Sequence, residues 1–434
     1  MYQRLIEYCE NRSVLLLGFG REGRSTYELI RKYYPQKPLG IADRNTVDIE
    51  DEHVQLFTGD GYLDAINQYD LVMQSPGISL RDVKLPESVE ISGQIDLFLR
   101  FVTCEKIGIT GTKGKSTTST LIYEILRAAG KPACLIGNIG TPVFESLADI
   151  AGKTAVIEMS SHQLEFAKAS PHIAVFTNIY EEHLDHYNGF KGYVGAKLNI
   201  LRFQDEKDYF FYNADQPLRD CIDFETLKAS GISVGKNDGE NDAFLHALTL
   251  LNSRLPGAHN HHDIYFAAAV AKSLGIEKDA MERGILNYSG IEHRMEPFGV
   301  FHGIQFYNDC IATVPESVLF AIHALKDVDC LIIGGMDRGI DYSKFVAELA
   351  KSGIGHLICM PETGHSIGKS LGMLGSKIDI VFVEDMEQAV QKVFELTEVG
   401  KSCLLSPAAP SYNRYKSFEE KGREFKKLVS EWMG

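Results

Sequence analysis

The chain has 434 residues, more than one ordinary hydrophobic core accommodates, so two to four domains are expected. Its formal net charge of −15 argues against non-specific binding to nucleic acid or to an anionic membrane surface. Eight cysteines form no C-x-x-C pair, and no run of about 18 apolar residues occurs. The composition therefore predicts a cytoplasmic protein with reduced thiols and no membrane span.

The first predicted domain, residues 1–92, opens with a glycine-rich loop after a short apolar run at residues 13–17. The loop reads Gly18-Phe19-Gly20-Arg21-Glu22-Gly23, and Asp43 and Arg44 follow the next apolar run. This is the pattern of a dinucleotide-binding fingerprint, in which a diphosphate sits on a helix N-terminus. These residues alone leave NAD and other nucleotides open. Residues 70–78 add a strand that ends in a turn containing Ser75 and Gly77, at the edge where open sheets bind ligands.

A second glycine-rich loop, residues 107–120, reads IGITGTKGKSTTST and begins the predicted middle domain, residues 93–290. An apolar strand, a turn with Gly111 and Gly114, and a helix-compatible segment at 117–129 predict a phosphate-binding loop. Lys115 would reach the outer phosphates and Ser116 would bind Mg²⁺. The strict phosphate-loop spacing is not met, because Ile109 occupies the place of its first glycine. ATP is the predicted ligand.

Apolar runs and helical stretches then alternate, which predicts a parallel sheet with its site at the carboxyl ends of the strands. Glu158 ends one run, and His183 follows another, so both are candidate ligands of a cation beside the phosphates. Lys197 lies in a helical stretch and on spacing alone is a surface lysine. His261 and His262 are interpreted as loop residues, because they lack the partners of a zinc site.

The last predicted domain, residues 291–434, repeats the α/β alternation and carries a Gly334-Gly335 turn after a strand. We find no low-complexity segment, heptad pattern or short-period repeat. Three α/β modules in series, two of them with a loop suited to phosphate, are the predicted organisation.

The order and spacing of several motifs resemble the Mur ligase family over essentially the whole chain. The motifs are GITGTKGKSTT (108–118), GNIGTP (137–142), EMSSHQLE (158–165), NIYEEHLDHY (178–187), AKLNIL (196–201), HRME (293–296) and SPAAPSYNRYKSFEEKG (406–422). The members that add glutamate to UDP-N-acetylmuramoyl-L-alanine are the most similar ones. The resemblance implies a Rossmann-like UDP-binding domain, a central ATPase domain of phosphate-loop type with a parallel sheet, and a Rossmann-like C-terminal domain.

The resemblance also implies a reaction and its residues. The substrate carboxylate attacks the γ-phosphate of ATP, and the amine of glutamate displaces phosphate from the resulting acyl phosphate. Catalytic positions would be Lys115, Asn138, His183 and Lys197. ATP would contact Gly111, Thr112, Lys113, Gly114, Lys115, Ser116, Thr117, Asn260, Arg294 and Asp309. The UDP substrate would contact Gly18, Phe19, Gly20, Arg21, Glu22, Asp43, Arg44, Ser75, Gly77 and Asn138. Glutamate would contact Thr313, Arg338, Ser411 and Phe418. Two Mg²⁺ ions would use Ser116, Glu158, His183 and Lys197, the last as an N6-carboxylysine (a carbamate).

Three positions depart from the family pattern. Ile311 replaces a lysine in the Asn-Asp-Ser-Lys-Ala-Thr motif, Arg338 stands where a lysine is common, and Asp263 where an asparagine is usual. A bidentate arginine is not equivalent to lysine on a carboxylate. D-glutamate is the expected substrate, with L-glutamate or another amino acid as the alternative.

Three further alternatives are a folylpolyglutamate synthase, an NAD-dependent oxidoreductase and a catalytically silent relative. A monomer that closes its last domain on ATP is expected, because the ATP and amino-acid residues fall on different domains.

Overall fold

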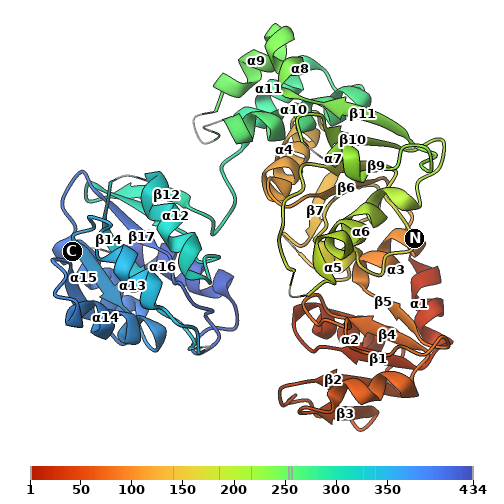
Figure 1. Cartoon of the computed structure of the whole chain (residues 1–434), viewed down its shortest axis with the longest axis horizontal. Helices are drawn as coiled ribbons and strands as arrows, with labels where there is room; N and C mark the ends of the chain where they lie inside the picture. Colours follow the sequence, from red (N-terminus) through yellow and green to blue (C-terminus); the bar gives the residue numbers. More distant parts are fainter. Residues whose placement is uncertain are drawn as a thin grey trace. The chain divides into compact units, whose positions relative to one another are not determined.

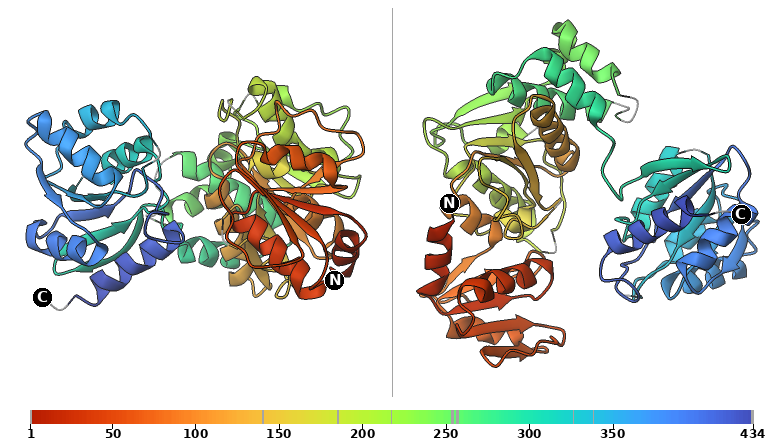
Figure 2. Two further views of the ribbon diagram at one scale, coloured as in Figure 1. Left: turned by 90° about the horizontal axis from the view of Figure 1, so that it is seen from below. Right: turned by 180° about the vertical axis from the view of Figure 1, so that it is seen from behind.

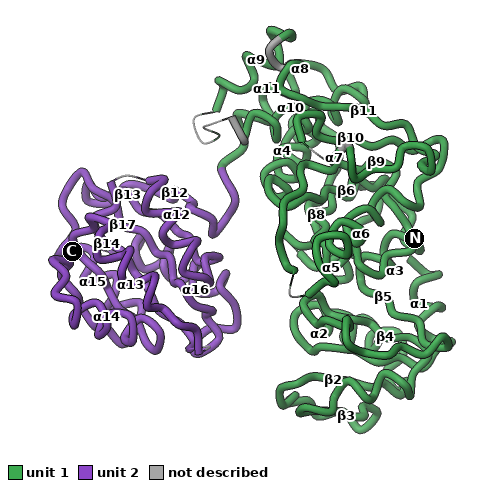
Figure 3. Tube along the Cα trace, in the orientation of Figure 1, with its two compact units in different colours: residues 1–289 green, residues 290–434 purple. Residues whose placement is uncertain are grey.

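The computed structural model describes residues 2–139, 141–184, 186–216, 218–252, 255, 258–325, 327–337 and 339–432. These residues form two compact units, 1–289 and 290–434 (Figure 3). Unit 1 contains two sheets and unit 2 contains one, and helices cover the faces of each sheet (Figures 1 and 2). The predicted α/β class is confirmed. The proposed limit between the first two domains at residue 92 stays a prediction.

The first sheet of unit 1 has the strand order β3-β2-β1-β4-β5, and every neighbouring pair is parallel. Its strands are β1 Val14–Leu17, β2 Leu39–Asp43, β3 Val54–Thr58, β4 Leu71–Gln74 and β5 Glu90–Ser92. Its helices are α1 Gln3–Glu10, α2 Arg21–Tyr33, the 3₁₀ helix η1 Tyr62–Gln68 and α3 Gln94–Phe101. β1 is buried along its whole length because helices cover both faces of a parallel sheet, which explains its continuous apolar sequence.

The second sheet has the order β11-β10-β9-β6-β8-β7, again with parallel pairs only. Its strands are β6 Lys106–Thr110, β7 Ala133–Gly137, β8 Thr154–Glu158, β9 Ile173–Phe176, β10 Tyr209–Asn213 and β11 Ser230–Val234. Its helices are α4 Lys115–Ala128, α5 Ser161–Leu164, α6 Gly189–Arg202, α7 Leu218–Cys221, α8 Lys236–Asn241, α9 Ala243–Leu250, α10 Ala258–Ser273 and α11 Lys278–Asn287. Helices α4, α10 and α11 pack together on one face, and α5 and α6 pack on the other (Figure 1).

The sequence interpretation of His261 and His262 as loop residues is wrong. Both lie in α10, which begins at Ala258, several residues before the alanine-rich segment that predicted it. The early turns of this helix are rich in histidine and asparagine, which are weak helix formers, so local propensity did not reveal its start.

Unit 2 contains one sheet with the order β12-β13-β17-β14-β15-β16. Its strands are β12 Glu296–Phe301, β13 Ile304–Asn308, β14 Val328–Ile333, β15 His356–Cys359, β16 Asp379–Phe382 and β17 Ser402–Leu405. Its helices are α12 Pro315–Leu325, α13 Ser343–Leu349, α14 Thr363–Met373, α15 Met386–Leu396 and α16 Phe418–Ser430. The β12–β13 hairpin is antiparallel and the other neighbours are parallel.

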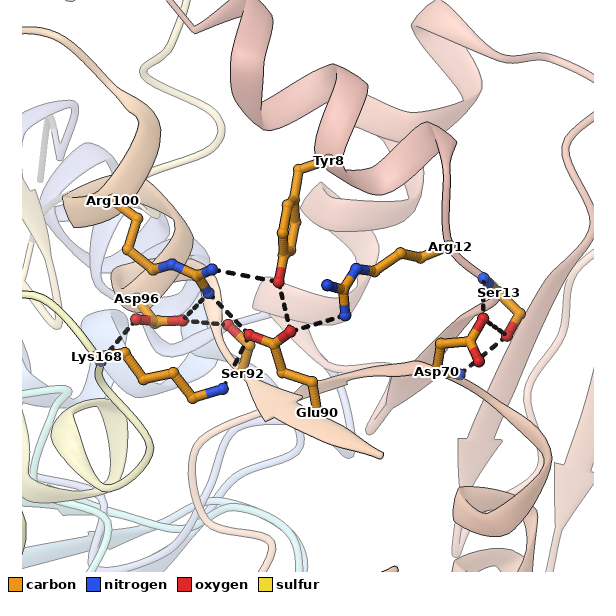
Figure 4. A network of polar contacts seen from close by, with 9 residues as sticks. All are labelled: Tyr8, Arg12, Ser13, Asp70, Glu90, Ser92, Asp96, Arg100 and Lys168. Carbon is orange, nitrogen blue, oxygen red and sulfur yellow. Dashed lines mark hydrogen bonds and ion pairs between the residues drawn. The ribbon is translucent and has the colours of Figure 1, made fainter. Parts of the chain in front are cut away.

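A group of charged side chains joins the first sheet of unit 1 to the segment after α5 (Figure 4). Glu90 accepts hydrogen bonds from Tyr8, from Arg12 and Arg100 at 2.8 and 2.9 Å, and from Lys168 at 2.8 Å. Burial alone would raise the pKa of Glu90, but the bonds from Lys168, Tyr8 and Arg100 lower it to about 2. The carboxylate is therefore a charged contact between the two sheets.

Replacing Glu90 by Gln is expected to lower the free energy of unfolding by about 2 kcal/mol at pH 7, because Arg12 and Lys168 lose their ion pair and Arg100 keeps only Asp96. The pKa of Glu90 is depressed, so its stabilisation is present above about pH 4.3 and is lost as pH falls toward 2. Urea unfolding at pH 7 and pH 2.5 measures this, with Asp82→Asn on an exposed pair as control. Equal effects of the two variants at pH 7 would contradict the role of Glu90.

Candidate active site

The loop between β6 and α4 has the geometry of a phosphate cradle. Gly111 and Gly114 have positive φ angles of 149° and 80°, which favour glycine. Gly114 is the N-cap of α4, and as a glycine it has no side chain that could cap the helix. The amides of the first turn, where Ser116 and Thr117 lie, together with the positive end of the helix dipole, therefore suit an anion.

The end of β9 holds the loop in this shape. Thr112 N–H donates to the Asn178 carbonyl at 3.0 Å, and Lys113 N–H donates to Asn178 Oδ1 at 2.8 Å. The Thr177 hydroxyl donates to the Lys113 carbonyl at 2.7 Å. A Cβ on Gly111 would lie 2.0 Å from Thr177 Oγ1, so the close contact also requires glycine.

Two lysines meet at the carbonyl of Gly111. Lys115 Nζ donates to it at 3.0 Å and also to the Thr112 carbonyl, and Lys197 Nζ donates to it at 2.7 Å. Lys197 is 2% exposed, so the spacing-based interpretation of a surface lysine is wrong. Burial first, and then the charge of Lys115, hold the pKa of Lys197 well below its ordinary value. The neutral amine of Lys197 is therefore more accessible than that of an exposed lysine.

Glu158, at the end of β8, offers a carboxylate oxygen that suits a cation. Its side chain is buried, and Oε1 accepts a hydrogen bond from Asn138 Nδ2 at 2.6 Å. Among the described residues, Oε2 is buried and has no hydrogen-bond partner. A buried carboxylate oxygen without a partner is costly unless a proton or a cation meets it. Together with Lys197, whose amine is influenced by the charge of Glu158, this fits a divalent cation.

His183 lies beside the same loop with a positive φ angle of 54°. Its Nε2 is 3.9 Å from a carboxylate oxygen of Glu182, and the other oxygen of Glu182 accepts from Lys113. The His183 ring lies against His162 and Tyr193, with centroid separations of 4.7 and 6.2 Å. The charge of Glu182 also acts on Lys197, so the phosphate loop, Glu158 and the segment after β9 surround one amine.

The first glycine-rich loop is built around hydrogen bonds to strand ends. Phe19 N–H donates to Asp43 Oδ2 at 2.8 Å, and the Ser75 hydroxyl donates to the Gly18 carbonyl at 2.9 Å. Glu22 Oε1 accepts from Gln163 Nε2 at 2.7 Å, and burial raises the pKa of Glu22 to about 7. A partly protonated Glu22 reduces the negative charge that an incoming diphosphate would meet.

The other residues predicted to contact the UDP substrate are more exposed to solvent. The side chains of Arg21 and Arg44 are exposed, and Gly20 and Gly77 are exposed as well. Arg21 lies 3.9 Å from Glu145. These positions border the loop and leave it accessible from solvent.

Unit 2 carries the remaining predicted positions, except that Asn260 lies in α10 of unit 1. Asp309 accepts from Met295 N–H at 3.0 Å and from the Ser406 hydroxyl at 2.8 Å, and burial raises its pKa to about 6. Arg294 is exposed. Ser411 is 2% exposed, and among the described residues its hydroxyl has no hydrogen-bond partner.

Thr313 and Phe418 are partly buried in unit 2, and Phe418 lies edge-on to His293 at 5.8 Å. Arg338 lies outside the described residues. Ile311, where a lysine was expected, contributes its backbone N–H to the His293 carbonyl at 3.2 Å.

Among the described residues, one group of three potential metal ligands lies close together. Its members are Glu292, His293 and Glu296, and their ligand atoms lie within 4.8 Å of one another. Lys426 donates to both carboxylates at 2.9 Å, so their charge is already paired within the protein. This group is therefore less suited to a metal than Glu158.

Sequence reasoning missed Lys421, a buried lysine of α16. It is 1% exposed, its Nζ donates to the Gly334 carbonyl at 2.6 Å, and burial lowers its pKa to about 8. Its spacing to Phe418, Phe425 and Val429 places it on the apolar stripe of the helix, which was the available signal. Lys421 fixes the glycine turn after β14.

Family models match most of the chain. The Mur ligase middle domain matches residues 109–271, and the Mur ligase glutamate ligase domain matches residues 293–409. The chain belongs to the Mur ligase family. The resemblance inferred from the motifs is thereby confirmed.

Several relatives of this Mur ligase are named UDP-N-acetylmuramoylalanine–D-glutamate ligase. The protein of Symbiobacterium thermophilum is 36% identical over 400 residues, 87% of each chain. That of Caldanaerobacter subterraneus is 35% identical over 88% of each chain, and that of Clostridium botulinum strain 657 is 30% identical over 99% of each. Similarity thus extends over the first domain, which the two family models do not include.

Solved structures share the fold at low identity. UDP-N-acetylmuramate-alanine ligase MurC of Thermotoga maritima aligns with a TM-score of 0.56 and 16% identity, over 97% of this chain and 99% of that one. Escherichia coli FolC, in complex with DHPP and ADP, aligns with a TM-score of 0.51 and 14% identity, over 75% of this chain and 89% of that one. In the part of the chain that the structure describes, no helix is long and apolar enough to cross a membrane.

Gly111→Ala tests the loop geometry. We expect a loss of about 2–3 kcal/mol in the stability of unit 1 and at least tenfold weaker ATP binding, because Cβ meets Thr177 Oγ1 and φ is unfavourable. Gly130→Ala is the matched control, since Gly130 also has a positive φ but an open surrounding, and it should leave ATP binding unchanged. Calorimetric titration with ATP and thermal unfolding measure both effects. Wild-type affinity in Gly111→Ala would contradict the cradle.

Proposed function

We propose that this Mur ligase joins D-glutamate to UDP-N-acetylmuramoyl-L-alanine with conversion of ATP to ADP and phosphate, a step in peptidoglycan precursor synthesis. The observation that carries the proposal is the phosphate loop on which Lys115 and Lys197 converge, next to the unpaired oxygen of Glu158. The names of the relatives supply the substrate class.

In the proposed first step, a carboxylate oxygen of the UDP substrate attacks the γ-phosphorus of ATP, and the bond to ADP breaks. Lys115 would leave the loop carbonyls and meet the phosphate oxygens, where its charge offsets the charge that develops on the transferred group. The α4 amides of Ser116 and Thr117 would position the phosphates.

In the second step, the glutamate amine attacks the acyl carbon, and the bond from carbon to the phosphate oxygen breaks. Phosphate and a proton are released. Asn138 donates a hydrogen bond to Glu158 and would orient the reacting carboxyl group. His183, next to Glu182, would lie on the same side of the loop. Thr313, Arg338, Ser411 and Phe418 would bind glutamate, and Asn260, Arg294 and Asp309 would contact the nucleotide.

Mg²⁺ would be held by Ser116, Glu158, His183 and carboxylated Lys197, and it would supply positive charge at the transferred phosphate. Carboxylation requires a neutral amine, and the lowered pKa of Lys197 favours that form. The ammonium group first loses a proton, and the neutral amine then adds to CO₂, forms an N–C bond and releases a second proton, so the cation of Lys197 becomes an anion. This change removes the like charge beside Lys115.

The UDP part of the substrate would bind on the first loop, at Gly18, Phe19, Gly20, Arg21, Glu22, Asp43, Arg44, Ser75 and Gly77. The rise in the pKa of Glu22 to about 7 supports diphosphate binding there. The protein is proposed to work as a monomer in the cytoplasm.

Phosphate release with UDP-N-acetylmuramoyl-L-alanine, Mg²⁺ and ATP tests the proposal, with D-glutamate, L-glutamate or no amino acid. We expect turnover that depends on D-glutamate. Turnover with L-glutamate alone would replace the substrate assignment and would implicate Ile311 and Arg338. No turnover with either would contradict the proposed reaction.

Bicarbonate dependence tests Lys197. Protein depleted of CO₂ is expected to lose at least tenfold in activity and to recover it when bicarbonate is added. Lys197→Ala is expected to lose at least a hundredfold without bicarbonate rescue, whereas Lys191→Ala, on the same helix but exposed, should behave like wild type. A ¹³C carbamate signal after addition of ¹³C-bicarbonate is the direct readout. Full activity of Lys197→Ala would contradict the assignment.

A further inference from the structure

Asp263 is a buried carboxyl group beside the phosphate loop that the proposed mechanism does not use. It lies in the second turn of α10, which packs on α4, and it is 5% exposed. The Thr118 hydroxyl, in the first turns of α4, donates to Asp263 Oδ1 at 3.0 Å. The carboxyl group is therefore held at the beginning of the helix on which nucleotide phosphates would sit.

The contact with the loop is close. A Cβ on Gly114 would lie 2.4 Å from Asp263 Oδ1 and 3.3 Å from Oδ2. The carboxyl group thus fills the space above the N-cap of α4, and both this contact and the positive φ of Gly114 require glycine. A negative charge at Asp263 would lie next to the amides that bind phosphate.

The surroundings provide little to stabilise such a charge. Among the described residues, no lysine, arginine or histidine forms an ion pair with Asp263. On α4, Lys115 points to the loop carbonyls, and on α10 the neighbouring His262 contacts Asp215, which follows β10. The positive end of the α4 dipole favours the carboxylate, but burial disfavours it more strongly and raises the pKa of Asp263 to about 8.

We propose that Asp263 is a positioning residue that packs against Gly114 as a neutral carboxylic acid, and that its ionisation weakens the binding of nucleotide phosphates. The inference rests on the proposed ATP function of the loop. A neutral acid supports the loop without repelling phosphate, and its O–H can donate a hydrogen bond. A carboxylate at the same place adds like charge within the cradle.

Calorimetric titration of the full-length protein with ADP in the absence of Mg²⁺, from pH 6 to pH 9.5, tests this inference. Mg²⁺ is left out so that protonation of the metal ligands does not contribute to the difference in ADP affinity between the variants. Wild-type affinity is expected to fall about tenfold more between pH 7 and pH 9.5 than that of Asp263→Asn, which has no charge to gain. The same pH dependence in both proteins would overturn the proposal.

Thr118→Val provides a second variant. The hydrogen bond from Thr118 lowers the pKa of Asp263, so its removal is expected to move the loss of ADP affinity to higher pH. A merely structural role of Asp263 would not move this profile. A loss of affinity at the same pH as in wild type would count against the inference, and Thr118→Val also replaces Asp263→Asn if that variant does not fold.

Thermal unfolding without nucleotide separates failure of this inference from failure of the ATP assignment. The folded pKa of Asp263 is raised from 3.8 to about 8, so its contribution to stability is full below pH 4 and is lost as pH rises toward 8. The unfolding midpoint of wild type should therefore fall relative to that of Asp263→Asn from pH 5 to pH 8. Above pH 8 the difference between the two midpoints should stay constant. A constant difference would overturn the neutral acid. If the unfolding midpoints show the expected pH dependence but ADP does not bind at any pH, the proposed function is contradicted and the neutral Asp263 is not.

Discussion

The hydrogen bonds that the carbonyl of Gly111 accepts from Lys115 and Lys197 organise the candidate active site. They require the φ angle of Gly111, which brings the loop against Thr177 and Asn178 at the end of β9. They also place two amines on one acceptor, which burial and mutual repulsion tolerate only with a lowered pKa at Lys197. The negative charges of Glu182 and Glu158 act on Lys197.

The residues proposed to bind the substrates are divided between the two units. Unit 1 contains both glycine-rich loops and the candidate metal ligands, whereas unit 2 contains Asp309 and the candidate glutamate residues. The two sheets of unit 1 are parallel and the sheet of unit 2 is largely parallel, so the polar side chains gather at the carboxyl ends of the strands. Within unit 1, the charged group around Glu90 joins the first sheet to the segment after α5 (Figure 4). A separate hydrogen bond from Gln163 of α5 to Glu22 holds the first loop.

The sequence predicted the fold class because apolar runs, glycine turns and helical stretches alternate with little ambiguity. Both loops were predicted from glycine spacing, even though Ile109 breaks the usual motif. The role of Lys197 could not be derived from spacing, since burial depends on how α6 packs behind β6, and only the family resemblance pointed to it. The pairing of Asp263 with Thr118 joins residues 145 positions apart, and no local pattern reveals such a contact.

ATP is proposed to bind the second glycine-rich loop and the UDP substrate is proposed to bind the first. Amide hydrogen exchange with ATP and Mg²⁺, and separately with UDP-N-acetylmuramoyl-L-alanine, measures this most directly. We expect ATP to protect the amides of residues 111–119 and the UDP substrate to protect those of residues 18–24. Protection of residues 18–24 by ATP, with no change at residues 111–119, would contradict it.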